Sequence, residues 1–213
     1  MSRFYEPVNG FTHLAGALLA ALGLVWLMTL TWDNTAKLVT VIVYGVSMIL
    51  CFSASTVLHL TQCSLPVRKW LTRADHASIY IMIAGTYTPF CYNVLTSEAW
   101  RWSILSLIWA LALAGVLYKL FLYNKEHHLS TLSYVAMGWL AVVLFPQALH
   151  MLPAPILWLV IGGGVTYSVG AVIFALKKPN FHRHFGFHEL WHLFVLGGSA
   201  LHFVAVLLLM TNR

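Results

Sequence analysis

The stretch FHELWHLFVLGGSALHFVAVLLLM, residues 187–210, decides how this chain folds. It is almost continuously apolar, and Glu189 is its only side chain with a formal charge at neutral pH. A helix needs about 20 apolar residues to cross the hydrocarbon core of a bilayer. The stretch therefore predicts a transmembrane helix, which begins with two histidines, His188 and His192, spaced four residues apart.

Six further apolar stretches of similar length precede it, at residues 12–31, 37–59, 76–96, 101–122, 130–150 and 155–176. Of the 213 residues, 60% are hydrophobic and only 8% are charged, and the mean hydropathy is +0.80. A soluble domain needs far more charged surface. We therefore predict an all-α polytopic membrane protein, a single domain over residues 1–213 built as a bundle of seven transmembrane helices.

The basic residues predict the orientation of this bundle. An odd number of spans places the termini on opposite sides of the membrane, and cytoplasmic loops are enriched in lysine and arginine. With a cytoplasmic N-terminus, nine basic residues fall inside: Arg3, Arg68, Lys69, Arg73, Lys119, Lys125, Lys177, Lys178 and Arg183. Only Lys37, Arg101 and Arg213 fall outside. We expect a multi-pass protein of the plasma (inner) membrane with its C-terminus outside, and no nucleic-acid partner.

Several polar residues gather at the cytoplasmic ends of distant spans. His188 and His192 are one helical turn apart, so their imidazoles can bind one metal ion, and His59 at the end of another span would be the third ligand. Ser55 shares a helix face with His59, and Asp75 opens the next predicted span. Three ligands with an open fourth position are typical of a catalytic zinc site, whereas interfacial histidines bonded to water and headgroups are the alternative.

Two further sets of polar residues are expected near this cluster, one beside His188 and one near the N-terminus. His188 to His192 matches the HExxH pattern of metalloproteases, in which Glu189 would be a general base. Alternatively, Glu189 is a carboxylate stabilised in the first turn of a helix. Near the N-terminus, Glu6, Asn9 and His13 share one helical face, which we expect to approach the cytoplasmic cluster. Arg73 is the expected partner of Glu6, and a helix cap is the other interpretation of that carboxylate.

Together, these motifs resemble the hemolysin III group of the progestin and adiponectin receptor (PAQR) superfamily, over essentially the whole chain. The resemblance is carried, in chain order, by Glu6, Asn9, Thr12 and His13, by Ser55 and His59, by Arg73, Asp75, His76 and Ile79, by residues 84–89 (AGTYTP), and by His188 and His192. It implies seven helices, a cytoplasmic N-terminus and zinc held by the three histidines near the inner face. It also implies that Asp75 orients water at the zinc and that Ser55 supports this network. Such proteins are similar to alkaline ceramidases, which hydrolyse lipid amides.

We therefore expect a zinc-dependent hydrolase of an amide or ester bond in a membrane lipid, with the acyl chain entering between helices. Two other functions stay open. One is a non-catalytic sensor or receptor of membrane homeostasis with a structural zinc ion, and the other is an intramembrane metalloprotease that uses Glu189.

Overall fold

The computed structural model describes residues 4–122, 127–182 and 185–212, with the side chains of 127–130 excepted, and it folds most of them into helices. The α-helices are α1 (Pro7–Thr31), α2 (Thr35–Leu60), α3 (Leu65–Val94), α4 (Glu98–Leu117), α5 (His127–Trp139), α6 (Phe145–Met151), α7 (Ala154–Leu176) and α8 (Phe187–Thr211). A π-helical turn, η1 (Tyr118–Leu122), extends α4, and a 3₁₀ turn, η2 (Leu140–Leu144), joins α5 to α6. The described residues form no β-strand, so the predicted all-α class is confirmed.

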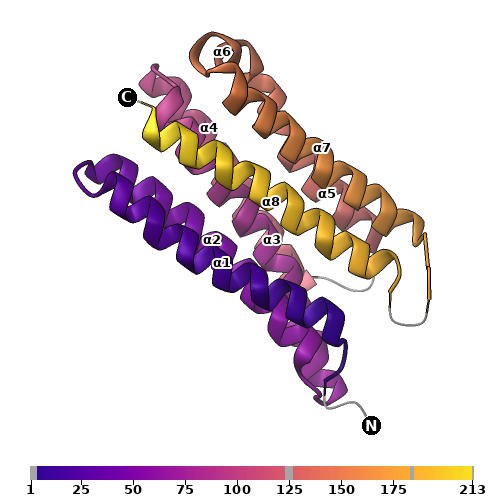
Figure 1. Ribbon diagram of the computed structural model, residues 1–213. Helices are drawn as coiled ribbons and strands as arrows, with labels where there is room; N and C mark the ends of the chain where they lie inside the picture. The colour runs from indigo at the N-terminus through magenta and orange to yellow at the C-terminus, as the bar shows by residue number, and fades with distance from the viewer. Residues whose placement is uncertain (1–3, 123–126, 183–184, 213) are drawn as a thin grey trace.

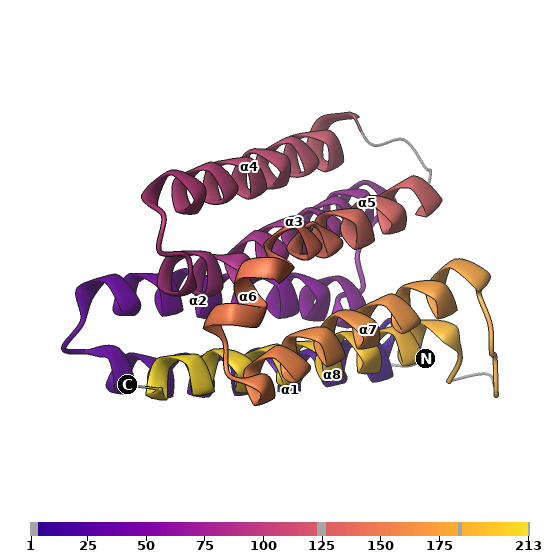
Figure 2. The same cartoon turned by 90° about the horizontal axis from the view of Figure 1, so that it is seen from above.

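The long helices run back and forth along one common direction (Figure 1). Viewed from above, α1, α7 and α8 lie on one side of the bundle, α4 lies on the opposite side, and α2, α3 and α5 lie between them (Figure 2). The beginning of α1 and the end of α8 lie at opposite ends of the bundle in both views.

Six helices in the described ranges are long and apolar enough to cross a membrane: Pro7–Thr31, Thr35–Leu60, Glu98–Leu122, Thr131–Met151, Ala154–Leu176 and Phe187–Thr211. This is the composition of a multi-pass integral membrane protein. The remaining predicted span lies in α3, which has 30 residues but carries a cluster of charged side chains in its first half. Four of the basic residues used to predict the orientation, Arg3, Lys125, Arg183 and Arg213, lie outside the described residues.

One predicted boundary was wrong, and one predicted span has the expected bounds but an irregular interior. Helix α3 begins at Leu65 rather than at residue 76, because Pro66 in its first turn is suited to start a helix, and Asp75 therefore lies within the helix. The expected span 130–150 is not one regular helix, since it changes to a 3₁₀ turn after Trp139 and restarts at Phe145. Pro146 explains this break, because proline lacks an N–H donor and clashes with the preceding helical turn.

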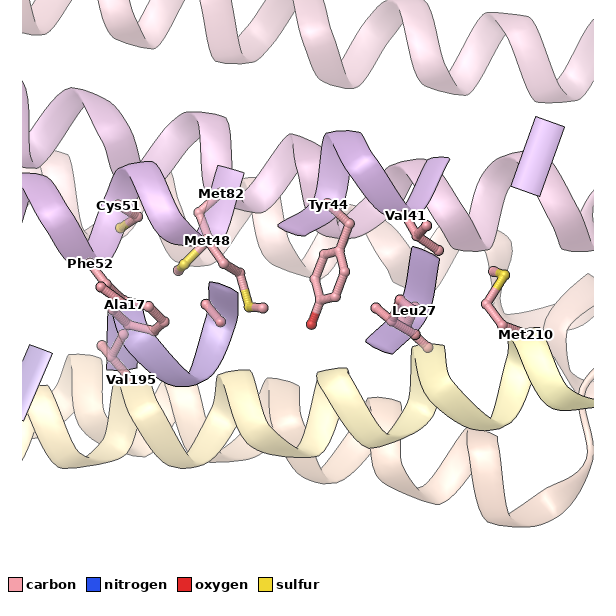
Figure 3. Packing of buried hydrophobic residues seen from close by; sticks show 12 residues of the cluster. Ala17, Leu27, Val41, Tyr44, Met48, Cys51, Phe52, Met82, Val195 and Met210 are labelled. Atoms are coloured by element: carbon pink, nitrogen blue, oxygen red, sulfur yellow. The ribbon is translucent and has the colours of Figure 1, made fainter. Parts of the chain in front are cut away.

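The main core lies between α1, α2 and α8. Figure 3 shows Leu27 of α1, Tyr44 and Phe52 of α2 and Val195 of α8 meeting in this layer. Gly16 lets α1 lie close to α8, because a Cβ atom added there would come within 2.6 Å of Leu196 Cδ2 and force that side chain to move. Small residues of this kind let membrane helices approach closely. This contact sets the N-terminal part of α1 against the beginning of α8, where the polar residues lie.

Candidate metal centre

The structure brings the three predicted ligand histidines together. His59 lies in the last turn of α2, whereas His188 and His192 lie in the first two turns of α8. One ring nitrogen from each lies within 4.8 Å of the others. The ring centroids are 5.1 Å apart for His59 and His188, 4.8 Å for His59 and His192, and 5.0 Å for His188 and His192. The three imidazoles thus surround one small volume, although they come from distant parts of the chain.

The N-terminal face of α1 reaches this cluster, as the sequence predicted. The ring of His13 stacks on that of His192 at a centroid distance of 3.8 Å and packs edge-to-face on Phe52 at 5.1 Å. The side-chain amide of Asn9 donates to Glu189 Oε1 at 3.0 Å. Asn9 and His13 are both buried, so the N-terminal part of α1 covers this side of the histidine cluster.

Asp75 and Ser55 form a second polar pair beside the histidines. The Ser55 hydroxyl is hydrogen-bonded to the Asp75 carboxylate, which lies close enough to His59 for their charges to interact. Ser55 is buried, and it lies on the same face of α2 as His59. The two residues predicted to do the chemistry therefore lie together at the histidine cluster.

The sequence did not single out two neighbours of this pair. Ser78 donates from its hydroxyl to the backbone carbonyl of Asp75 at 2.6 Å, and it is also hydrogen-bonded to the thiol of Cys51. Helical spacing was the available signal, because Cys51 precedes Ser55 by one turn and Ser78 follows Asp75 by about one turn. Both residues belong to the polar network that surrounds Asp75.

Glu6 pairs with His59 rather than with Arg73, so that part of the prediction was wrong. Its Oε2 lies 2.5 Å from His59 Nδ1, and its backbone N–H donates to the carbonyl of His59 at 2.8 Å. Arg73 instead donates to the carbonyl of Leu120 at 3.1 Å and lies over the ring of Trp70. The hydrogen bond from His59 outweighs partial burial and lowers the pKa of Glu6.

Glu189 stabilises the start of its own helix. Its Oε2 accepts a hydrogen bond of 2.7 Å from the backbone N–H of Gly186, and its other oxygen accepts the bond from Asn9. This bond is the Glu189 half of a capping box, in which the acidic side chain at the third helical position binds the backbone N–H of the N-cap residue, Gly186. The geometry supports the first-turn interpretation of Glu189.

A cavity of about 530 Å³ begins at the cluster and continues through the bundle. His188, His192, Ser55 and Asp75 line it, and so does His202, which is about 21 Å from His188 along the axis of α8. Most of its other lining side chains are apolar or aromatic, from α3, α5, α7 and α8. The site thus joins a compact polar cluster to a long apolar cavity.

A bundle of apolar helices that gathers three histidines at one end defines a polytopic membrane protein with a candidate metal site. Comparison with known proteins identifies its family, because the family model described as haemolysin-III related matches residues 1–203. The chain belongs to this family, as its motifs predicted.

The relatives of the chain extend from bacteria to mammals. It is 40% identical to Hemolysin-3 of Bacillus cereus over 204 residues, which cover 95% of this chain and 90% of the relative. It is 37% identical to a Hemolysin-3 homolog of Bacillus subtilis, covering 95% and 92%. The human Monocyte to macrophage differentiation factor is 28% identical over 212 residues, covering 95% and 83%. These relatives fit the predicted hemolysin III group of the PAQR superfamily.

Proposed function

We propose that this protein is a zinc-dependent hydrolase that cleaves an amide or ester bond in a membrane lipid. The observation that carries the proposal is the meeting of His188, His192 and Asp75 at the end of one long apolar cavity. A single site then holds the ligands for a metal ion, a carboxylate for proton transfer and space for a lipid chain. The similarity of the motifs to alkaline ceramidases points to the same class of reaction.

The histidine cluster fits zinc. Zinc binds imidazole nitrogens at about 2.0–2.1 Å and accepts three protein ligands with one position left open. Because Glu6 occupies Nδ1 of His59, Nε2 is the nitrogen left for a metal. Nδ1 of His192 is buried and has no well-aligned hydrogen-bond partner among the described residues, and the ring also lies at the backbone of Asn9. When bound, zinc supplies a Lewis acid that polarises a carbonyl group and makes water acidic.

The chain's own residues would carry the proton transfer. Asp75 accepts a proton from the attacking water at a carboxylate oxygen, and Ser55 holds that carboxylate in place by hydrogen bonding. As water adds to the carbonyl carbon, the C–N or C–O bond breaks and Asp75 delivers the proton to the leaving group. The polar network around Asp75 keeps the carboxylate directed at the reacting atoms.

The cavity has the size and chemistry of a lipid-chain site. Its volume of about 530 Å³ lies within the usual range of roughly 300–1,000 Å³ for small-molecule pockets. Its apolar walls favour a hydrocarbon chain, whereas its polar end is suited to a carbonyl group. We infer that the chain enters laterally between helices and that the headgroup stays near the histidines.

The proposed membrane frame has seven spans in one domain, with α3 as the span beyond the six most apolar ones. The beginning of α1 and the end of α8 lie at opposite ends of the bundle, which favours this odd number of spans (Figure 1). The N-terminus would lie in the cytoplasm and the C-terminus outside the inner membrane, because that orientation places nine of the twelve basic residues inside. The metal site would then lie near the cytoplasmic leaflet.

A second candidate function is a non-catalytic sensor or receptor in which zinc stabilises the bundle. One of the three histidines comes from α2 and the other two come from α8. A bound ion would therefore link these two helices, which favours this function. The metalloprotease alternative is weaker, because both carboxylate oxygens of Glu189 are engaged in hydrogen bonds.

The test is a lipid-hydrolysis assay on the purified protein, with ceramides and esters of several chain lengths as substrates. The hydrolase proposal expects turnover that is lost in both His188→Ala and Asp75→Ala. Retained turnover in both variants would refute it. A zinc-dependent melting temperature without turnover of any lipid would favour the sensor.

A further inference from the structure

We propose that Glu6 is a positioning residue that orients His59 for metal binding. We further propose that Asn9, through its hydrogen bond to Glu189, links Glu6 to the start of α8, which carries the other two histidines. The inference rests on the proposed metal site. It assigns to that site a second layer of residues, two from the N-terminal segment and one from the first turn of α8. We call Glu6, Asn9 and Glu189 the outer clasp.

Glu6 holds His59 at two points. The carboxylate lies 2.5 Å from Nδ1 of the ring, and the backbone N–H of Glu6 donates to the carbonyl of His59 at 2.8 Å. An ionised carboxylate can only accept hydrogen bonds, so Nδ1 carries a hydrogen, and in the neutral imidazole that binds a metal the lone pair is then on Nε2. Carboxylates commonly fix the tautomer and orientation of metal-binding histidines in this way. Glu6 thus prepares His59 to bind a metal through Nε2.

The alternative role for Glu6, a cap of its own helix, does not fit the contacts. Glu6 occupies the N-cap position of α1, but its side chain makes no capping hydrogen bond. Its carboxylate instead contacts His59 and the amide of Asn9, at 3.5 Å for the latter. The Glu6 side chain therefore stabilises the end of α2 and does not cap the start of α1.

The residue before Glu6 keeps this segment in place. The guanidinium group of Arg68 lies 3.6 Å from the ring centroid of Tyr5, and Arg68 also donates to the carbonyls of Leu58 and Thr61, at 2.9 Å and 2.5 Å. Leu58 directly precedes His59. The contacts of Tyr5 and Glu6 thus hold the N-terminal segment in one register against the last turn of α2.

Asn9 connects this contact to the other two histidines. It is buried, and its amide nitrogen bridges Glu6 Oε2 and Glu189 Oε1. Glu189 in turn accepts a hydrogen bond of 2.7 Å from the backbone N–H of Gly186, which fixes the first turn of α8, where His188 lies. The outer clasp therefore sets the position of His59 relative to the histidine pair.

The test measures zinc affinity in the full-length protein in detergent, by competition with a chelator of known affinity. The variants are Glu6→Leu, which removes the acceptor, Glu6→Gln, which keeps a neutral one, and Asn9→Ala. Glu98→Gln is the matched control, because Glu98 lies in the first turn of α4, remote in the chain from the histidines. The melting temperature of each metal-free protein is measured in parallel.

We expect Glu6→Leu to weaken zinc binding by about 10–100-fold, the usual effect of losing an outer-shell partner. Glu6→Gln should recover part of that loss, Asn9→Ala should have a smaller effect than Glu6→Leu, and Glu98→Gln should bind zinc like the wild type. The metal-free melting temperatures should fall little in Glu6→Gln. If Glu6→Leu is not recovered as folded protein, Glu6→Gln alone must still show weaker binding.

An unchanged zinc dissociation constant in the folded Glu6 variants would overturn the inference while leaving the metal site intact. A lower metal-free melting temperature with unchanged affinity would show a purely structural role and overturn it too. Absence of zinc binding in the wild-type protein would instead refute the proposed function, and with it the clasp.

Discussion

The rings of His13 and His192 stack face to face, with centroids 3.8 Å apart and an angle of 24° between their planes. One ring comes from α1 and the other from α8, so the contact joins the first and last helices of the bundle at the histidine cluster. Neither ring nitrogen of His13 has a well-aligned hydrogen-bond partner among the described residues. The ring of His13 therefore serves as a flat packing surface for His192.

This packing role predicts different effects for two substitutions. His13→Ala removes a buried ring and should lower the free energy of unfolding by roughly 2–5 kcal/mol, the cost of a large-to-small change in a core. His13→Phe keeps an aromatic surface and removes two buried nitrogens that have no well-aligned partner among the described residues, so it should be about as stable as the wild type. Thermal unfolding in one detergent measures both. A large loss of stability in His13→Phe would mean that the ring nitrogens make essential hydrogen bonds.

Asp75 and Ser55 should differ in how strongly they affect turnover. Asp75→Asn removes the proton acceptor and should lower kcat by about 10²–10⁴-fold while the zinc content stays normal. Ser55→Ala should lower kcat by roughly 10–100-fold, because a hydrogen bond to a charged group is worth about 1.5–3 kcal/mol. Steady-state lipid hydrolysis and metal analysis on the same samples measure the two effects. Equal kcat values for Asp75→Asn and the wild type would exclude Asp75 as the base.

Glu189 distinguishes the lipid hydrolase from a metalloprotease. Because glutamine keeps only one of the two acceptor oxygens, Glu189→Gln should lose one of its two hydrogen bonds and destabilise the protein by roughly 1–3 kcal/mol. It should retain more lipid turnover than Asp75→Asn. The metalloprotease hypothesis requires the reverse order with a protein substrate. Paired assays of the two variants on lipid and protein substrates decide between these functions.

The cavity wall at Gly164 offers a test of the lipid-chain site. A Cβ atom added at Gly164 meets no atom within 4 Å, and Gly164 lines the cavity. Gly164→Phe should therefore fill part of the cavity and lower turnover of long-chain substrates more than that of short-chain ones. The neighbouring Val165, which is 46% exposed on the outside of α7, gives the matched control Val165→Phe. A similar loss for both chain lengths in Gly164→Phe would argue against this site.

The sequence predicted those features that depend on local composition. Apolar runs marked the regions that form α1, α2, α7 and α8, because a chain in lipid must satisfy its backbone within each helix. The i, i+4 spacing placed His188 and His192 on one face of α8. The position of His59 at the cytoplasmic end of another span added it to the same site, in agreement with the motif resemblance. Helical spacing also predicted that Asn9 and His13 would face the cluster.

Other features depend on tertiary contacts that a single sequence does not reveal. The choice of His59 rather than Arg73 as the partner of Glu6 follows from how the N-terminal segment lies along the end of α2. The start of α3 at Leu65 was hidden because its first turns are polar and lack the apolar run that marks a span. Pro146 was visible in the sequence, but the accompanying 3₁₀ turn was not.

The central claim is that His59, His188 and His192 bind one zinc ion. Elemental analysis of the purified full-length protein, combined with anomalous X-ray scattering at the zinc absorption edge, tests it most directly. We predict one zinc ion per chain among these three rings, lost in His188→Ala and retained in His150→Ala, which changes an exposed histidine remote from the cluster in the chain. A protein purified in the presence of zinc that carries no metal at these rings, or keeps it in His188→Ala, would contradict the account.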